Sequence, residues 1–146
     1  MARVSTYLNF AKSTEAAFRF YAGVFGTSVV GPMRFGDIPA GPGQPPVPDS
    51  VKNLVMHIEL PTLGGHVLMG TDAPEEMGFQ LTQGNTTHIM LEPDTKEEGT
   101  RLFQALAADG EVKMPLQDMF WGDYYGELKD KFGVLWMVNV PAPKNP

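Results

Sequence analysis

Few side chains in this sequence could carry acid–base or metal chemistry, and histidine is the scarcest of them. The 146 residues include three histidines and no cysteine. His57 and Glu59 are two positions apart in an apolar segment, so a β-strand would place both on one face, where they could act as an acid–base couple. Such a pair is more often the solvated face of a strand, and this is what we expect here. His66 follows two glycines at a strand start and is expected to be exposed.

Several common catalytic patterns are absent. No serine, histidine and aspartate follow one another in the context of a nucleophile elbow. The segment AGPGQPP has prolines where a phosphate-binding loop needs amides, and no helix pattern follows it. The same absence argues against a methyltransferase. Without cysteine there is no disulfide, thiolate metal site or cysteine nucleophile, which fits a reducing cytosol.

Composition limits the class of protein further. Hydrophobic residues make up 42% and charged residues 19%, which is enough apolar surface for a core and too little charge for disorder. The length suits one domain, or two small related halves fused into one. The net charge of −6 argues against a nucleic-acid partner. No stretch resembles a signal peptide or a membrane span, so we expect a cytoplasmic protein with no membrane contact.

Hydrophobic periodicity predicts the same order of elements twice. In the first half a strand is followed by a helix with an apolar stripe and a glycine stop, and then by three extended segments. These segments are residues 4–10, 13–25, 28–35, 54–60 and 66–70. The expected stripe of the first helix comprises Ala17, Phe20, Tyr21, Val24 and Phe25, with Ser13 or Thr14 as the N-cap. Residues 36–50, which are rich in glycine and proline, are expected to form a long exposed loop with no helix.

The second half repeats this order about 80 residues later. Its predicted elements are residues 87–91, 95–109, 111–114, 124–128 and 134–140. Thr95 opens the helix with a capping box, and Leu102, Phe103, Leu106 and Ala107 form its stripe. The fold class is therefore α+β, with two βαβββ modules. We expect a single domain over residues 1–146, with modules at about 1–72 and 86–140.

The segment from Asp118 to Asn139 is the most informative part of the chain, since glycines punctuate an aromatic strand that leads through a charged turn into an apolar strand. Its sequence, FWGDYYGELKDKFGVLWMVN, closely resembles the C-terminal hairpin of the PhnB-like proteins. These are a branch of the vicinal-oxygen-chelate (glyoxalase/bleomycin resistance/dioxygenase) superfamily. The segments STYLNFAKSTEAAFRFYAGVFG and THIMLEPDTKEEGTRLFQALAADGEVKMP are similar to the family's earlier elements, so the resemblance covers nearly the whole chain.

The resemblance implies an incomplete, cupped barrel and four positions where metal-using members carry ligands. Counted on this sequence, those positions are Thr6, Met69, His88 and Met137. Only His88 is a good ligand for a hard divalent ion, because thioethers suit softer metals such as Cu(I). We therefore expect no metal and no cofactor.

Strand alternation then describes the interior of the expected cup. If those four residues face inward, so do Leu8, Val67, Met90 and Leu135, which makes a methionine-rich apolar wall. His88 is either a core histidine bonded to the backbone or a pocket imidazole, and we take the pocket. The family hairpin would put Trp121 and Tyr125 at the mouth. The predicted ligand-binding residues are Thr6, Met69, His88, Met90, Trp121, Tyr125 and Met137, while no catalytic residue is assigned.

These observations favour a metal-free protein that binds a small, partly apolar molecule. The alternative is a glyoxalase- or dioxygenase-type lyase or isomerase that acts on a small metabolite, with His88 in acid–base chemistry. A third reading is a dimer without a ligand. We expect a homodimer, as is common in this superfamily, and residues 36–50 are a candidate to reach the partner or to fold over the cup.

Overall fold

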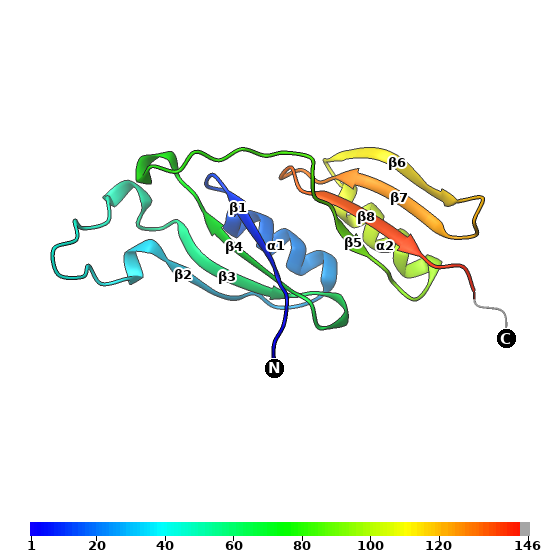
Figure 1. The fold of residues 1–146 in the computed structure, drawn as a ribbon, viewed down its shortest axis with the longest axis horizontal. Coiled ribbons are helices and arrows are strands. Elements are labelled where there is room, and N and C mark those ends of the chain that lie inside the picture. The colour runs from blue at the N-terminus through cyan, green and yellow to red at the C-terminus, as the bar shows by residue number, and fades with distance from the viewer. Residues whose placement is uncertain (144–146) are drawn as a thin grey trace. The chain divides into compact units, whose positions relative to one another are not determined.

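The computed structural model describes residues 1–143, and these form two compact units, one from Met1 to Thr82 and one from Gln83 onward. Each unit has the order strand, helix, three strands (Figure 1). The first unit contains β1 (Thr6–Phe10), α1 (Thr14–Phe25), β2 (Val30–Arg34), β3 (Val55–Pro61) and β4 (Val67–Asp72). The second contains β5 (Ile89–Leu91), α2 (Lys96–Ala107), β6 (Glu111–Asp118), β7 (Tyr124–Lys129) and β8 (Leu135–Val140).

The two sheets share one topology. The strand order is β1-β4-β3-β2 in the first sheet and β5-β8-β7-β6 in the second. In each sheet the first strand pairs in parallel with the last, and the remaining pairs are antiparallel. The predicted α+β class with two βαβββ modules is confirmed.

One helix covers one face of each sheet. α1 packs on β3 and β4, and α2 packs on β6, β7 and β8. Because side chains alternate along a strand, every second residue is buried against the helix. In β4 these residues are Leu68, Gly70 and Asp72, while in β8 they include Val138 and Val140. We call the face that points away from the unit's own helix the distal face.

Two glycines let the helices lie close to the sheets. A Cβ on Gly70 of β4 would stand 2.6 Å from a ring carbon of Phe18 in α1. In the second unit the glycine is on the helix instead, where a Cβ on Gly99 of α2 would stand 2.7 Å from a methyl of Val140. Contacts this short are not tolerated, so each helix–sheet interface needs a missing side chain at its closest point.

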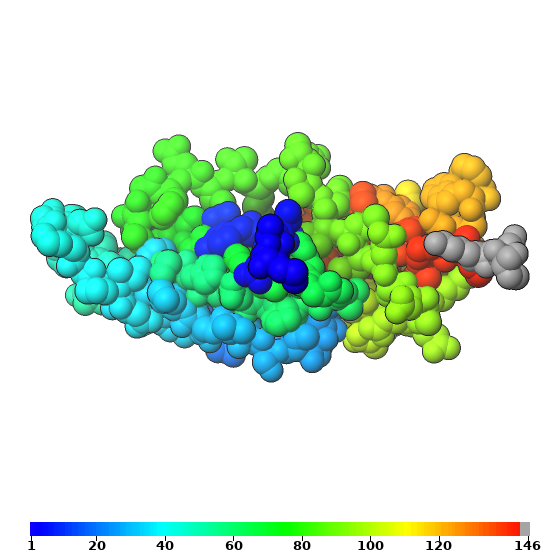
Figure 2. Space-filling model, turned by 60° about the horizontal axis from the view of Figure 1, so that its bottom comes forward, coloured from blue at the N-terminus to red at the C-terminus, as the bar shows by residue number. Residues whose placement is uncertain are grey.

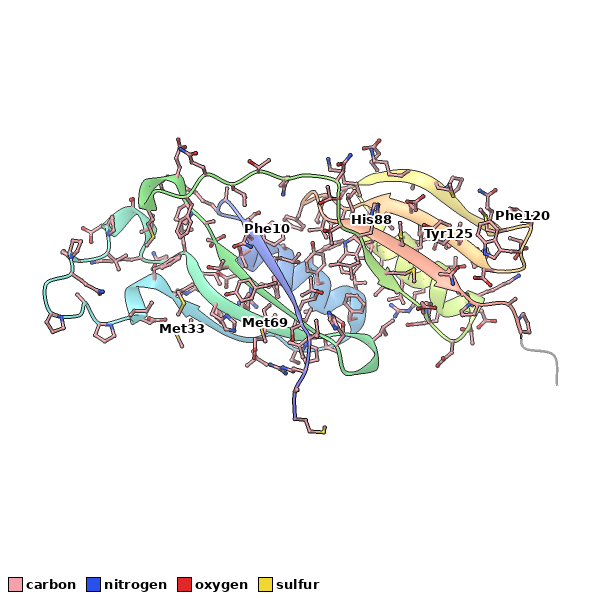
Figure 3. All side chains as sticks on the ribbon, viewed as in Figure 1. Phe10, Met33, Met69, His88, Phe120 and Tyr125 are labelled. Atoms are coloured by element: carbon pink, nitrogen blue, oxygen red, sulfur yellow. The ribbon has the colours of Figure 1, made fainter. Side chains whose placement is uncertain are left out.

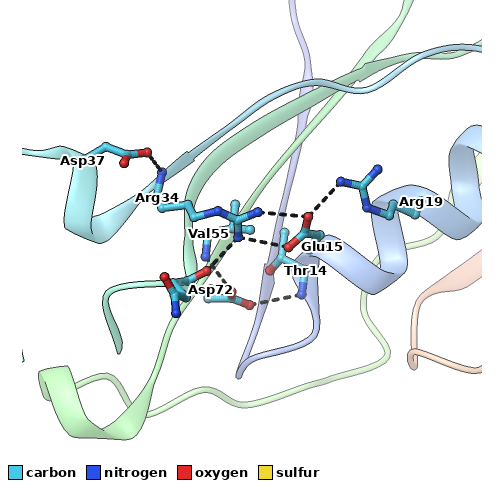
Figure 4. Close-up of polar contacts among 8 residues, drawn as sticks. Thr14, Glu15, Arg19, Arg34, Asp37, Val55 and Asp72 are labelled. Carbon is cyan, nitrogen blue, oxygen red and sulfur yellow. Dashed lines mark hydrogen bonds and ion pairs between the residues drawn. The ribbon is translucent and has the colours of Figure 1, made fainter. Parts of the chain in front are cut away.

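The start of α1 is held from another strand. Ser13 is the N-cap residue, but its side chain makes no capping hydrogen bond. The amide of Thr14 donates instead to the carboxylate of Asp72 in β4, which also accepts from the amide of Val55 at the start of β3 (Figure 4). Ser13 therefore occupies the predicted N-cap position, but a buried carboxylate from far along the chain, and not the serine side chain, accepts the hydrogen bond at the helix end.

The apolar stripe of α1 also differs in part from the prediction. Ala17, Tyr21 and Val24 are buried as expected, and so is Phe18, which the pattern did not select. Phe20 and Phe25 are only partly buried. The stripe is shifted by about one residue because Phe18 lies over Gly70, where the helix and the sheet are closest.

The second helix follows its sequence more directly. The side chain of Thr95 accepts a hydrogen bond from the amide of Glu98, as the capping pattern predicts. Leu102, Phe103 and Leu106 are buried. A second buried carboxylate, Asp130, holds the turn between β7 and β8, since it accepts from the amides of Phe132 and Val134 and from the indole N–H of Trp136.

The glycine- and proline-rich segment 36–50 projects from the first unit as an extended loop (Figures 1 and 2). Each end of the loop enters a single 3₁₀ turn, Phe35–Asp37 and Asp49–Val51. The expectation of a segment without any helix was therefore wrong at its two ends. A single 3₁₀ turn needs only one i to i+3 hydrogen bond, so it forms where a longer helix cannot.

In the described part of the chain, residues 1–143, no helix is long and apolar enough to cross a bilayer.

Replacement of Gly70 tests the close packing of α1. We expect Gly70→Ala to destabilise the protein by about 1–3 kcal/mol, because the new methyl overlaps the buried Phe18 ring. Gly23→Ala is the control, since nothing lies within 4 Å of its Cβ in α1. It should stabilise the protein by up to about 1 kcal/mol through helix propensity. Urea unfolding followed by tryptophan fluorescence measures both, and equal effects would contradict the packing argument.

A second prediction concerns Glu15, whose carboxylate bridges α1 to β2. Arg34 donates two hydrogen bonds to it at 3.0 and 3.1 Å, and Arg19 donates one at 2.9 Å (Figure 4). The hydrogen bonds from Arg34, and then the one from Arg19, lower the pKa of Glu15 from 4.5 to about 2. A lowered folded-state pKa means that the contribution is complete above pH 4.5 and is lost as the pH falls toward 2.

We therefore expect Glu15→Gln to destabilise the protein at pH 6 by on the order of 1 kcal/mol, because solvent screens the partly exposed pair. The difference from wild type should shrink at pH 3. Glu98→Gln removes a comparable pair with Arg101, but that pair lies within one exposed helical turn and should matter less. Urea titrations at the two pH values make the comparison, and a pH-independent difference would exclude the ionic contribution.

Candidate functional site

The distal face of the second sheet brings together four of the predicted residues. Met90 of β5 pairs with Met137 of β8, and Met137 pairs on its other side with Glu127 of β7. These three side chains form one row across the sheet. His88 precedes Met90 by two residues and so lies on the same face, and Tyr125 lies there because it precedes Glu127 by two.

His88 faces a carboxylate that the sequence did not lead us to select. Its Nε2 atom is 3.7 Å from Oε1 of Glu127, and about a quarter of each side chain is exposed. This distance is too long for a hydrogen bond, so the imidazole and the carboxylate face each other in partly buried surroundings without a direct bond.

Tyr125 adds a hydroxyl to the same face, two residues before Glu127 on β7. Burial, and then the charge of Glu127, raise the pKa of its phenol. The hydroxyl therefore stays protonated and can donate a hydrogen bond. Figure 3 shows His88 and Tyr125 at successive places along the second sheet. The second unit thus carries an imidazole, a carboxylate and a phenol beside two methionines.

Trp121 lies apart from His88 in the connection between β6 and β7. Its ring packs edge to face on Phe120, with centroids 4.8 Å apart, and half of Trp121 is exposed. The connection joins β7 at Tyr124, which pairs with Val140 at the end of β8, whereas His88 lies toward the start of β8. Trp121 therefore lies toward the Tyr125 end of this sheet, away from His88.

In the first unit, Thr6 does not share a face with Met69. Thr6 pairs with Leu68, and Tyr7 pairs with Met69, so Tyr7 and not Thr6 lies on the distal face. The predicted inward orientation of Thr6 and Leu8 was wrong by one residue, and such a shift turns every side chain to the other face. The alternation of residues along β1 predicts the correct face, because Leu8 and the buried Phe10 form the apolar side of this strand.

Thr6 instead bonds a histidine at the same end of the sheet. Its Oγ1 is 2.8 Å from Nε2 of His66. His66 is therefore partly buried and has a partner, which corrects the expectation of an exposed side chain. This contact joins β1 to the residue before β4 and has a structural role.

The distal face of the first sheet holds a polar cluster around His57 and Glu59, the pair that we expected to be a solvated strand face. The hydroxyl of Tyr7 is 3.0 Å from Nδ1 of His57, and Nε2 of His57 is 3.6 Å from Oε1 of Glu59. About a third of His57 and 28% of Glu59 are exposed, so the pair is not simply a solvated strand face. Burial, and then the charge of Glu59, raise the pKa of Tyr7.

The two units place a glutamate and a methionine at equivalent positions. Glu59 pairs with Met69 between β3 and β4, and Glu127 pairs with Met137 between β7 and β8. Each glutamate also has a histidine nearby. The sequence indicates the equivalent positions of the two glutamates, since Glu59 follows His57 by two residues in one strand and Glu127 follows Tyr125 by two residues in the other.

Asp123 has a structural task. It accepts hydrogen bonds from the side-chain amide of Asn139 and the backbone amide of Ala142. The bond from Ala142 is the first cause that lowers the pKa of Asp123, and the bond from Asn139 is the second. The carboxylate thus fixes the chain that leaves β8.

Comparisons with known proteins agree with this architecture. The model of the Glyoxalase/Bleomycin resistance protein/Dioxygenase superfamily matches residues 3–138. Protein YjdN from Escherichia coli (strain K12) is 31% identical over 145 residues, with 94% of each chain covered. The structure of protein PA1353 from Pseudomonas aeruginosa has a TM-score of 0.83 and 33% identity over 98% of this chain and 100% of that one.

A PhnB protein from Bacillus cereus is also similar in structure. Its TM-score is 0.72 at 28% identity, and the match covers 96% of this chain and 100% of that one. Together with the two βαβββ modules, these matches show that the chain belongs to the Glyoxalase/Bleomycin resistance protein/Dioxygenase superfamily and is a PhnB-like member of it.

Proposed function

We propose that this chain binds a small, partly apolar molecule on the distal face of its second sheet, with His88 as a polar contact. The observation that carries the proposal is the pairing of His88 with Glu127 beside Met90 and Met137. All four lie on a face that α2 does not cover. A face that combines flexible apolar side chains with a few polar groups has the composition of a ligand site.

Two kinds of side chain on this face, apolar and polar, would contact the ligand. Met90 and Met137 offer polarizable surfaces that adapt to irregular apolar shapes. His88 and Tyr125 offer hydrogen bonds, and the raised pKa of Tyr125 keeps its hydroxyl a donor. Met69 occupies the equivalent position in the first unit, and its part in binding stays a prediction.

The side chains do not fit the metal centre that metal-using relatives carry. In the first unit Tyr7 of β1 pairs with Met69 of β4. In the second unit Met90 of β5 pairs with Met137 of β8. Residues 1–143 contain no group of three or more His, Cys, Asp or Glu placed to hold an ion. His88 and Glu127 alone would bind a divalent metal weakly. The metal-free state remains our prediction.

A lyase or isomerase is the second candidate function. The facing imidazole and carboxylate favour it, because a histidine side chain is the group that most often exchanges a proton with a bound substrate. In this reading the same face would bind the substrate and His88 would move a proton. Assembly as a homodimer, location in the cytoplasm and the absence of a nucleic-acid partner also stay predictions.

Ligand-induced thermal stabilisation tests the binding proposal. We expect some members of a library of small, partly apolar molecules to raise the melting temperature of the wild type. A ligand at a hundred times its Kd stabilises the folded state by about 2.7 kcal/mol. His88→Ala should retain the fold and lose the shift, since it removes the polar contact and leaves the core intact.

Two further variants make this test decisive. Met137→Ala should weaken ligand binding and cost less than about 2 kcal/mol of stability, because Met137 is only partly buried. Phe120→Ala removes a fully exposed aromatic ring and should keep the full shift. If no compound shifts the wild type and both His88→Ala and Met137→Ala destabilise it, the face is filled core and the proposal fails.

Elemental analysis tests the metal prediction. We expect unheated protein, purified without chelators, to contain less than stoichiometric Fe, Ni, Zn or Mn, because the second sheet offers one imidazole and one carboxylate. His88→Ala should leave the metal content unchanged. A stoichiometric divalent metal in the wild type that is lost in His88→Ala would contradict the prediction and favour the enzyme.

A further inference from the structure

We propose that Tyr7, His57 and Glu59 form a recognition site of the first unit, in which the Tyr7 hydroxyl donates a hydrogen bond to the carbonyl oxygen of a neutral small molecule. The proposal goes beyond the His88 site and rests on first-unit residues alone. No part of it requires that the second sheet bind anything.

The three side chains come from two strands that β4 separates. Tyr7 is on β1, and His57 and Glu59 are on β3. Their polar atoms follow the order hydroxyl, imidazole, carboxylate, with distances of 3.0 and 3.6 Å. The rings of Tyr7 and His57 are also in contact, with centroids 5.7 Å apart. The imidazole is therefore held between a hydroxyl and a negative charge.

The tautomer of His57 decides what Tyr7 can offer. With its proton on Nε2, His57 accepts the Tyr7 O–H at Nδ1, so the hydroxyl proton is occupied. With its proton on Nδ1, His57 donates to the Tyr7 oxygen instead. The Tyr7 O–H is then released to donate to a ligand.

The surrounding charges select the kind of ligand. Burial and Glu59 raise the pKa of Tyr7, so the residue acts as a phenol and not as a phenolate nucleophile. Glu59 also disfavours an anionic ligand. Arg3 lies 3.6 Å from the same Glu59 oxygen, but its side chain is 58% exposed and solvent screens it. A neutral acceptor such as an amide, ketone or aldehyde oxygen remains.

Two methionines provide the apolar part of the site. Met69 pairs with Tyr7 on one side and with Glu59 on the other. Met33 of β2 pairs with His57 and is half exposed. Figure 3 shows both methionines on the first sheet. A ligand with an aromatic or aliphatic body next to its carbonyl group would contact thioethers and the hydroxyl together.

Benzamide and benzoate are a matched pair of probes, since they differ mainly in charge. Binding is followed by NMR titration of the full chain, with histidine ring signals assigned by His57→Asn. We expect benzamide to shift the His57 signals and to bind more tightly than benzoate. Tyr7→Phe should weaken benzamide binding about tenfold, as loss of one hydrogen bond implies. Tyr124→Phe, which removes a hydroxyl bonded to Thr100, should have no effect.

The same two probes separate an electrostatic role of Glu59 from simple packing. Glu59→Gln removes the carboxylate that faces the site, so it should narrow the preference for benzamide over benzoate. A purely structural role of Glu59 would leave the ratio of the two affinities unchanged. Within residues 1–143, Tyr7 and Glu59 contact the imidazole, and Arg3 lies beside Glu59.

Two results would overturn the inference. One is benzamide affinity in Tyr7→Phe equal to that of the wild type, and the other is no binding by the wild type up to the solubility limit of benzamide. If His88→Ala weakens benzamide binding and Tyr7→Phe does not, the second-sheet proposal gains support and this one fails. If Tyr7→Phe weakens benzamide binding and His88→Ala does not, the first-unit inference is supported.

Discussion

Each sheet has one helix to cover it, and strand alternation assigns every residue either to that helix or to the distal face. This constraint shapes both units, because a side chain can only reach the distal face if its neighbours along the strand are apolar or small enough for the helix side. In β4, Leu68 and Gly70 meet α1 and leave Met69 outward, and in β8, Val138 and Val140 meet α2 and leave Met137 outward. The chemistry of the molecule is therefore carried by alternate residues.

Close helix packing and two buried carboxylates maintain this arrangement. Asp72 ties the start of α1 to β3 and β4, and Asp130 ties the turn of the last hairpin to Trp136. Both carboxylates accept hydrogen bonds from backbone amides, which compensate for their removal from water. A strand anchored in this way cannot slip by a residue, so the polar groups of the distal faces keep their neighbours.

The distal faces carry the same residue types in different orders. Each holds a glutamate paired with a methionine, a histidine near the glutamate and a tyrosine whose pKa the glutamate helps to raise. In the first unit His57 bonds a tyrosine hydroxyl, whereas His88 in the second faces a carboxylate at 3.7 Å. The same residue types therefore present different polar groups on the two distal faces.

The sequence alone determined the βαβββ repeat, the helix cap at Thr95 and the faces of β4, β5 and β8, because these depend on short-range periodicity and local hydrogen bonding. It also contained the correct face of β1, through Leu8 and Phe10, although counting from the following helix selected Thr6. Only the tertiary structure decided that Asp72 caps α1, that Tyr7 meets His57 and that Glu127 faces His88. Each of these contacts joins strands far apart along the chain, and the parallel pairing of β1 with β4 and of β5 with β8 has no local signal that sets its register.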